Sequence, residues 1–153
     1  MGIEFEVSRD FSQSPREIFE VLTDLDRATE WVPGLLEIEQ VGEGPFGPQT
    51  RWIETRSFLG KEATEEFEVT SFGPPAVLVI RAHGNRGGSA HGEYVFRYRL
   101  VPEGTGTRVT LRGEVRGLQG LTKWLSQLFA RTYKEARTRD LDALAEYLDG
   151  PPT

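Results

Sequence analysis

The chain has 153 residues, a formal net charge of −6 and no cysteine. This length fits one domain with a core of its own, and the missing thiols exclude disulfides, thiolate metal sites and a cysteine nucleophile while favouring a cytoplasmic location. The acidic balance argues against nucleic acid as a partner, and the longest apolar run, residues 76–80, is too short for an integral membrane segment.

The first predicted elements are a strand and two short helices. Alternating apolar and polar residues predict a half-buried strand over residues 3–11. Ser14 is suited to cap a helix, because a proline follows it at the first helical position. A second short helix is predicted over residues 25–31, and the sequence around Pro33 ends it.

Further strands and one long helix follow. The strands are separated by turns rich in Gly and Pro, and they are predicted over residues 36–41, 49–58, 61–72, 76–83, 90–101 and 107–116. After Gly120 the apolar period changes from that of a strand to that of a helix, which predicts a helix of roughly 30 residues. We expect Leu121, Leu125 and Leu128 to form the face of this helix that covers the sheet.

This order of elements predicts an α+β fold. Consecutive strands joined by short loops form an antiparallel meander, and its apolar face needs a cover. The C-terminal helix is the only predicted element long enough. We therefore expect a helix-grip architecture, in which a curved seven-stranded antiparallel sheet wraps around that helix. Residues 1–149 are predicted to form one ligand-binding domain, and residues 150–153 a tail.

Three short motifs carry a resemblance to a known family. They are Ser14-Pro15-Arg16-Glu17-Ile18-Phe19, Trp31-Val32-Pro33-Gly34 and Gly104-Thr105-Gly106-Thr107. Together with the element order they resemble the START-like superfamily, which includes polyketide cyclases and dehydrases and lipid-transfer domains. The resemblance implies a hydrophobic cavity and no universal catalytic residue. Because the motifs are caps, turns and core positions, they indicate the fold and do not select a function.

The predicted hairpin after residue 58 places two carboxylates opposite each other. A two-residue turn at Leu59-Gly60 pairs Glu54 with Glu65 and Trp52 with Phe67. The aromatic pair argues that this face points inward, with Arg56 on the same face. Facing carboxylates out of bulk water should have a raised pKa. A register error of one residue would instead turn these side chains to solvent.

The next strand allows two registers. If Val77 and Val79 point inward, so do Arg81 and His83, and a cluster of Glu54, Glu65 and His83 could perform general acid–base chemistry. If Leu78 and Ile80 point inward, Arg81 and His83 do not. The candidate catalytic residues are therefore Glu54, Glu65 and His83.

The last hairpin has one self-consistent register. A pairing of Leu100 with Val109 places Phe96 opposite Gly113, which leaves room for that ring or for a ligand. Buried tyrosines need hydroxyl partners, and Trp31 either gates a cavity or closes its own helix. The candidate ligand-binding residues are therefore Trp31, Trp52, Arg56, Phe67, Tyr94, Phe96, Tyr98, Gly113, Leu121, Leu125 and Leu128.

The sequence leaves three functions open. It contains no Walker A loop, dinucleotide fingerprint or zinc-binding spacing, so we expect no cofactor and no metal. The first function is binding or transport of a lipid-like, polyketide or aromatic ligand, and the second is a cyclase or dehydratase. The third is a protein-interaction module, since residues 1–75 carry 16 acids and 6 bases whereas residues 76–153 carry 8 acids and 12 bases. The oligomeric state stays open.

Overall fold

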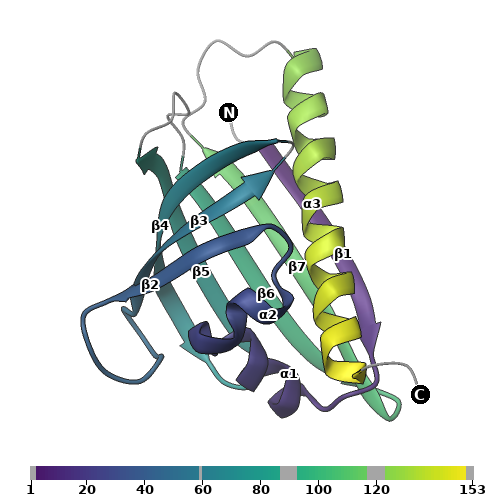
Figure 1. Ribbon diagram of the computed structural model, residues 1–153. Coiled ribbons are helices and arrows are strands. Elements are labelled where there is room, and N and C mark those ends of the chain that lie inside the picture. The colour runs from purple at the N-terminus through teal and green to yellow at the C-terminus, as the bar shows by residue number, and fades with distance from the viewer. Residues whose placement is uncertain (1–2, 59, 87–92, 117–122, 151–153) are drawn as a thin grey trace.

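The computed structural model describes residues 3–58, 60–86, 93–116 and 123–150. Within them the strands form one antiparallel seven-stranded sheet in the order β1-β7-β6-β5-β4-β3-β2, and the predicted α+β fold is confirmed. The strands are β1 (Ile3–Phe11), β2 (Leu35–Val41), β3 (Arg51–Phe58), β4 (Lys61–Gly73), β5 (Val77–Arg86), β6 (Glu93–Glu103) and β7 (Gly106–Arg116). Figure 1 shows that the sheet is strongly curved.

The helices cover the concave side and one end of the sheet (Figure 1). The long helix α3 (Lys123–Asp149) runs beside β1, and the short elements α1 (Pro15–Leu22), η1 (Leu25–Arg27) and α2 (Ala28–Trp31) follow β1. The Ser14 side chain caps α1 as predicted, because its hydroxyl accepts a hydrogen bond from the Glu17 N–H at 3.3 Å. The second predicted helix is a 3₁₀ turn followed by one α-helical turn.

Two predicted strand registers are confirmed. In the β3–β4 hairpin Glu54 lies opposite Glu65 and Trp52 opposite Phe67. In the β6–β7 hairpin Phe96 lies opposite Gly113. Both hairpins have short turns, and a short turn fixes the pairing of every residue that follows it.

Of the two registers left open for β5, the structure has the one in which Leu78 and Ile80 point inward. Ser71 pairs with Val79 and Gly73 pairs with Val77, so β4 continues to Gly73 before the chain turns. The register shifts by one position between Val69 and Ser71, and a shift of one residue decides which face of β5 points inward. The inner side chains of this strand are therefore Leu78, Ile80 and Ala82, each at most 8% exposed.

The predicted covering face of α3 also needs correction. Leu128 is 48% exposed, and it lies nine positions, or about 2.5 helical turns, from the inward-facing Arg137. Leu125 is half-buried, and Leu121 lies outside the described residues. The buried face instead carries Leu141 and Leu144. The sequence holds two apolar stripes of different phase, and the stripe of the C-terminal half is the one that packs on the sheet.

Candidate functional site

Charged side chains from the sheet and from α3 meet inside the curve of the sheet. Glu54 and Arg56 of β3 and Glu65 of β4 share the inner face, since each is two positions from, or directly opposite, another of them. Arg137 and Asp140 approach from α3 and complete the cluster. Five ionisable groups inside a small domain are costly unless they are paired or functional.

Asp140 holds the two arginines of the cluster together. Both terminal nitrogens of Arg56 donate to its carboxylate, and Nη1 of Arg137 donates to Oδ2 at 2.8 Å. Nε of Arg56 donates to the carbonyl oxygen of Pro33 at 2.8 Å, which fixes the guanidinium against the chain segment after α2. Asp140 is only 5% exposed. One buried carboxylate thus pairs with two guanidinium groups, and the three groups together carry one net positive charge.

The two glutamates lie beside this positive charge. Burial raises the pKa of Glu54 to about 7, although Arg56 and Arg137 oppose the shift. Burial also raises the pKa of Glu65, again against the two arginines. Both side chains nevertheless keep partial access to solvent. Carboxyl groups that are surrounded by protein yet reached by solvent can exchange protons with a bound molecule.

Access to the inner face differs along the sheet. Leu78, Leu100 and Leu111 are at most 2% exposed, whereas Glu54 and Glu65 are half-buried. Solvent therefore reaches the concave face from the half that carries the β3–β4 hairpin, and the other half is a closed core.

Aromatic rings form one wall of the site. The guanidinium carbon of Arg137 lies 4.1 Å from the centre of the Phe96 ring, in a cation–π contact. The Tyr133 hydroxyl donates to the Tyr94 hydroxyl at 3.1 Å. Burial raises the pKa of Tyr98 to about 12, so this phenol stays protonated near neutral pH. Tyr94, Phe96 and Tyr98 are each at most 9% exposed, so these rings are packed closely with a few hydroxyl groups among them.

A second aromatic group lines the opposite part of the inner face. Trp52 and Phe67 stack with ring centres 5.4 Å apart, as expected from their predicted pairing. Phe46, from the loop before β3, lies 5.7 Å from Trp52 and 6.0 Å from Phe72. Sequence reasoning missed Phe46, because it follows a Gly-Pro turn and belongs to no periodic pattern.

Two predicted ligand-binding residues have unexpected surroundings. Nε1 of Trp31 is buried and has no hydrogen-bond partner among the described residues. The space above Gly113 is filled by the ring of Phe5, whose Cζ would lie 2.1 Å from an added Cβ. That space is therefore taken by neither Phe96 nor a ligand, and a side chain at position 113 would displace Phe5.

The candidate residues separate into a group that meets and a group that does not. The inner faces of β3, β4 and β6 bring together Trp52, Glu54, Arg56, Glu65, Phe67, Tyr94, Phe96 and Tyr98. The register on which a cluster with His83 depended is not the one found, because the backbone of His83 pairs with Glu66 rather than with Glu65. Arg137, Asp140 and Tyr133 were missed. They fall at helical spacing from Leu144, and that phase was the available signal.

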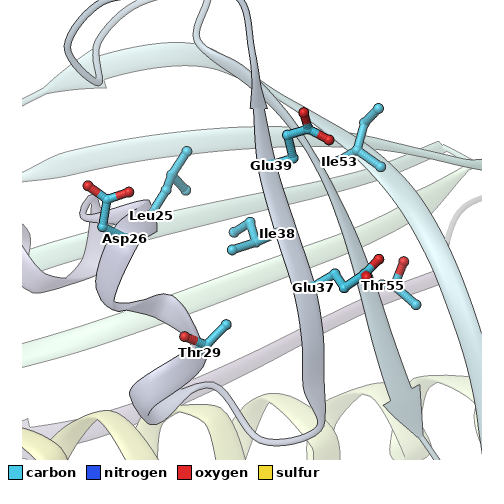
Figure 2. Close-up of a pocket in the computed structure, with 8 residues that line it drawn as sticks. All are labelled: Leu25, Asp26, Thr29, Glu37, Ile38, Glu39, Ile53 and Thr55. Atoms are coloured by element: carbon cyan, nitrogen blue, oxygen red, sulfur yellow. The ribbon is translucent and has the colours of Figure 1, made fainter.

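A groove lies outside the sheet, away from the charged cluster. It is a groove of about 580 Å³ between η1–α2 and β2, lined by Leu25, Asp26, Thr29, Glu37, Ile38, Glu39, Ile53 and Thr55. Figure 2 shows Glu37 beside Thr55 and Glu39 beside Ile53, with Asp26 across the groove. These carboxylates are exposed. In the described part of the chain no cluster of acids and histidines could hold a metal ion.

The comparisons with known proteins agree with this architecture. A family model described as "Polyketide cyclase / dehydrase and lipid transport" matches residues 2–149. Among curated proteins no match was found. In the described residues no helix is long and apolar enough to cross a membrane.

Solved structures resemble the chain over nearly its whole length. The Zhui aromatase/cyclase from Streptomyces sp. R1128 has a TM-score of 0.74 at 16% identity, over 95% of this chain and 92% of that one. The protein TTHA0849 from Thermus thermophilus has a TM-score of 0.74 at 19% identity, over 93% and 94%. The di-domain ARO/CYC BexL from the BE-7585A biosynthetic pathway has a TM-score of 0.80 at 12% identity, over 99% of this chain and 51% of that one. Such identities show a shared fold alone.

Proposed function

Because the chain belongs to the family of polyketide cyclases, dehydrases and lipid-transport proteins, we propose that it binds a small hydrophobic ligand between α3 and the concave face of the sheet. The observation that carries this proposal is the partly accessible cluster of Glu54, Glu65 and Arg137 between two aromatic groups. Apolar walls take up a flat or lipid-like body, and a few placed polar groups orient it.

The polar groups favour a ligand that carries oxygen atoms. Arg137 is a cation, Tyr98 is a neutral donor, and the buried N–H of Trp31 has no protein acceptor among the described residues. Carbonyl and hydroxyl oxygens of a polyketide-like or aromatic molecule would accept these hydrogen bonds. A pure hydrocarbon would leave the donors unpaired, which is costly.

Displacement of a fluorescent dye tests this function. Nile red should bind to the purified protein, and a fatty acid or a flat aromatic such as naphthol should displace it. Ala130 is half-buried and packs against the core on the inward side of α3. Ala130→Phe should weaken dye binding by about tenfold, equivalent to ~1.4 kcal/mol.

The matched control is Ala136→Phe, since position 136 is also half-buried but lies about 1.7 helical turns from position 130. It should bind the dye like the unsubstituted protein, and both variants should keep a cooperative thermal transition. Full affinity in Ala130→Phe, or no dye binding by the unsubstituted protein, would refute the proposal.

A second candidate function is catalysis of cyclisation or dehydration in the same site. It is favoured by Glu54, because a carboxyl group with a pKa of about 7 can accept and return a proton near neutral pH. In such a reaction the Glu54 carboxylate would take a proton from carbon between two carbonyl groups, and Tyr98 would donate a hydrogen bond to a carbonyl oxygen. Turnover of a poly-β-ketone analogue should rise with an apparent pKa near 7 and be lost in Glu54→Gln. A rate profile unchanged by that substitution would exclude this role.

A further inference from the structure

Large apolar side chains are exposed on the N-terminal half of α3. Trp124 is 69% exposed, Leu128 48% and Phe129 39%. We call these three residues the apolar patch. Trp124 and Leu128 are four positions apart and share one helix face, and Phe129 lies beside them. Single exposed apolar residues need no explanation, but a group that includes Trp commonly marks an interaction site.

Aromatic rings connect the apolar patch to the interior. The ring of Phe129 lies 6.4 Å from that of Tyr133, with an angle of 25° between the planes. Tyr133 in turn stacks on Phe5 at 6.2 Å and donates its hydroxyl to Tyr94. A continuous series of aromatic rings therefore leads from the surface of α3 to the wall of the proposed binding site.

The helix segment that carries the patch is basic. Residues 123–139 contain Lys123, Arg131, Lys134, Arg137 and Arg139 and a single acid, Glu135. Arg137 is tied to Asp140 inside the protein. The contact of Arg131 with Glu135, at 3.4 Å, joins two largely exposed side chains and is weak. Although the whole chain carries −6, charges farther away than a Debye length of ~10 Å are largely screened.

We propose that the apolar patch docks the protein on the surface of an anionic lipid bilayer. Trp favours the boundary between headgroups and acyl chains, and a helix with apolar residues beside Lys and Arg lies in that boundary. The local basic charge complements anionic headgroups, and the aromatic series from Phe129 to Tyr94 connects the patch with the proposed binding site. The inference rests on the proposed ligand-binding function, because it names the bilayer as the source of the ligand.

Vesicle flotation tests the proposal. The full chain is mixed with vesicles of phosphatidylcholine containing phosphatidylglycerol, or of phosphatidylcholine alone, at low and at high salt. It should float with the anionic vesicles, and high salt should weaken the association. Trp124→Ser and Leu128→Ser should each reduce the floating fraction by about tenfold. Leu36→Ser is the matched control, because Leu36 of β2 is 50% exposed against 48% for Leu128, and it should float normally.

Other outcomes overturn the proposal. The unsubstituted chain staying with the soluble fraction would do so, as would equal flotation of Trp124→Ser. A dimer that Trp124→Ser dissociates, without vesicle binding, would assign the patch to a second copy of the chain. Nile red binding in buffer without vesicles distinguishes a failure of the ligand-binding proposal from a failure of the docking proposal. If the dye binds and the vesicles do not, ligand binding stands and docking fails. If the vesicles bind and the dye does not, ligand binding fails and the patch docks without delivering a ligand.

Discussion

The two halves of α3 carry similar numbers of large apolar side chains but use them differently. In the C-terminal half Leu141 and Leu144 are 2% and 0% exposed, whereas Trp124 and Leu128 in the N-terminal half are 69% and 48% exposed. An amphipathic pattern alone therefore does not identify the face of a helix that packs on the sheet. The rotational position of that face relative to the sheet decides which side chains are buried.

The boundary between the two halves is where the charged groups lie. Arg137 and Asp140 follow the exposed stretch and precede the buried leucines, and Asp140 reaches across to Arg56 on β3. The helix thus passes from an exposed segment through a polar joint to a core segment. Each part should respond to substitution in its own way.

The largest effect is expected in the core segment. Leu144→Ala removes a side chain that is fully buried, and the cavity it leaves should lower the free energy of unfolding by about 4 kcal/mol. Chemical denaturation measures this value. A loss below ~1 kcal/mol would mean that the C-terminal half of α3 is not docked on the sheet.

A slightly smaller effect is expected at the polar joint. Asp140→Asn leaves Arg56 and Arg137 without their common counter-ion in a buried place, which should cost about 3 kcal/mol. The control is Asp142→Asn, because the Asp142 side chain, 45% exposed, pairs with Arg9 at the surface. That control should cost at most about 1 kcal/mol. Equal losses in the two variants would show that the joint behaves like a surface pair.

The pH dependence of stability should distinguish the interior carboxylates from exterior ones. The folded-state pKa of Glu54 is about 7 and lies above its ordinary value of 4.5. Its contribution is therefore fully present below the unfolded pKa, and it is lost as pH rises through about 7. Glu54→Gln should stabilise the protein at about pH 8 by up to ~2 kcal/mol relative to its effect at about pH 5.

Glu37→Gln provides the control for that titration, since Glu37 is exposed in the groove outside the sheet and should leave the pH profile unchanged. Denaturation midpoints across the pH range measure both variants. A profile for Glu54→Gln that runs parallel to that of the unsubstituted protein would place Glu54 in bulk solvent.

The smallest effect on stability is expected in the exposed segment. Leu128→Ser should change the free energy of unfolding by no more than ~0.5 kcal/mol, because its side chain is largely in solvent already. Thermal denaturation checks this. A loss comparable to that of Leu144→Ala would mean that the N-terminal half of the helix is part of the core.

Sequence reasoning succeeded where a short turn sets the pairing. The turn before Lys61 placed Glu54 opposite Glu65, and the last hairpin placed Phe96 opposite Gly113. It left two registers open for β5, because the register shift in β4 leaves no compositional trace.

The charged joint was the part of the site least accessible to prediction. Arg56 and Asp140 are 84 positions apart in sequence, so no local pattern links them. Their contact depends on the rotational phase of α3, and Leu128 of the predicted covering face is about 3.6 helical turns from Leu141 of the buried face. The predicted covering face of Leu121, Leu125 and Leu128 therefore did not indicate that Arg137 points inward.

The position of β1 in the sheet has a consequence for biosynthesis. β1 pairs with β7, so that Ile3 lies opposite Val115. In the order of the described sheet β1 has no other neighbouring strand. As the chain leaves the ribosome, the apolar side chains of Ile3, Phe5 and Val7 must wait for about a hundred further residues before their partner strand emerges, and α3 follows later still. An unpaired apolar strand is open to association with other chains during this interval. Slower translation should therefore favour chaperone binding at the N-terminal strand rather than earlier folding.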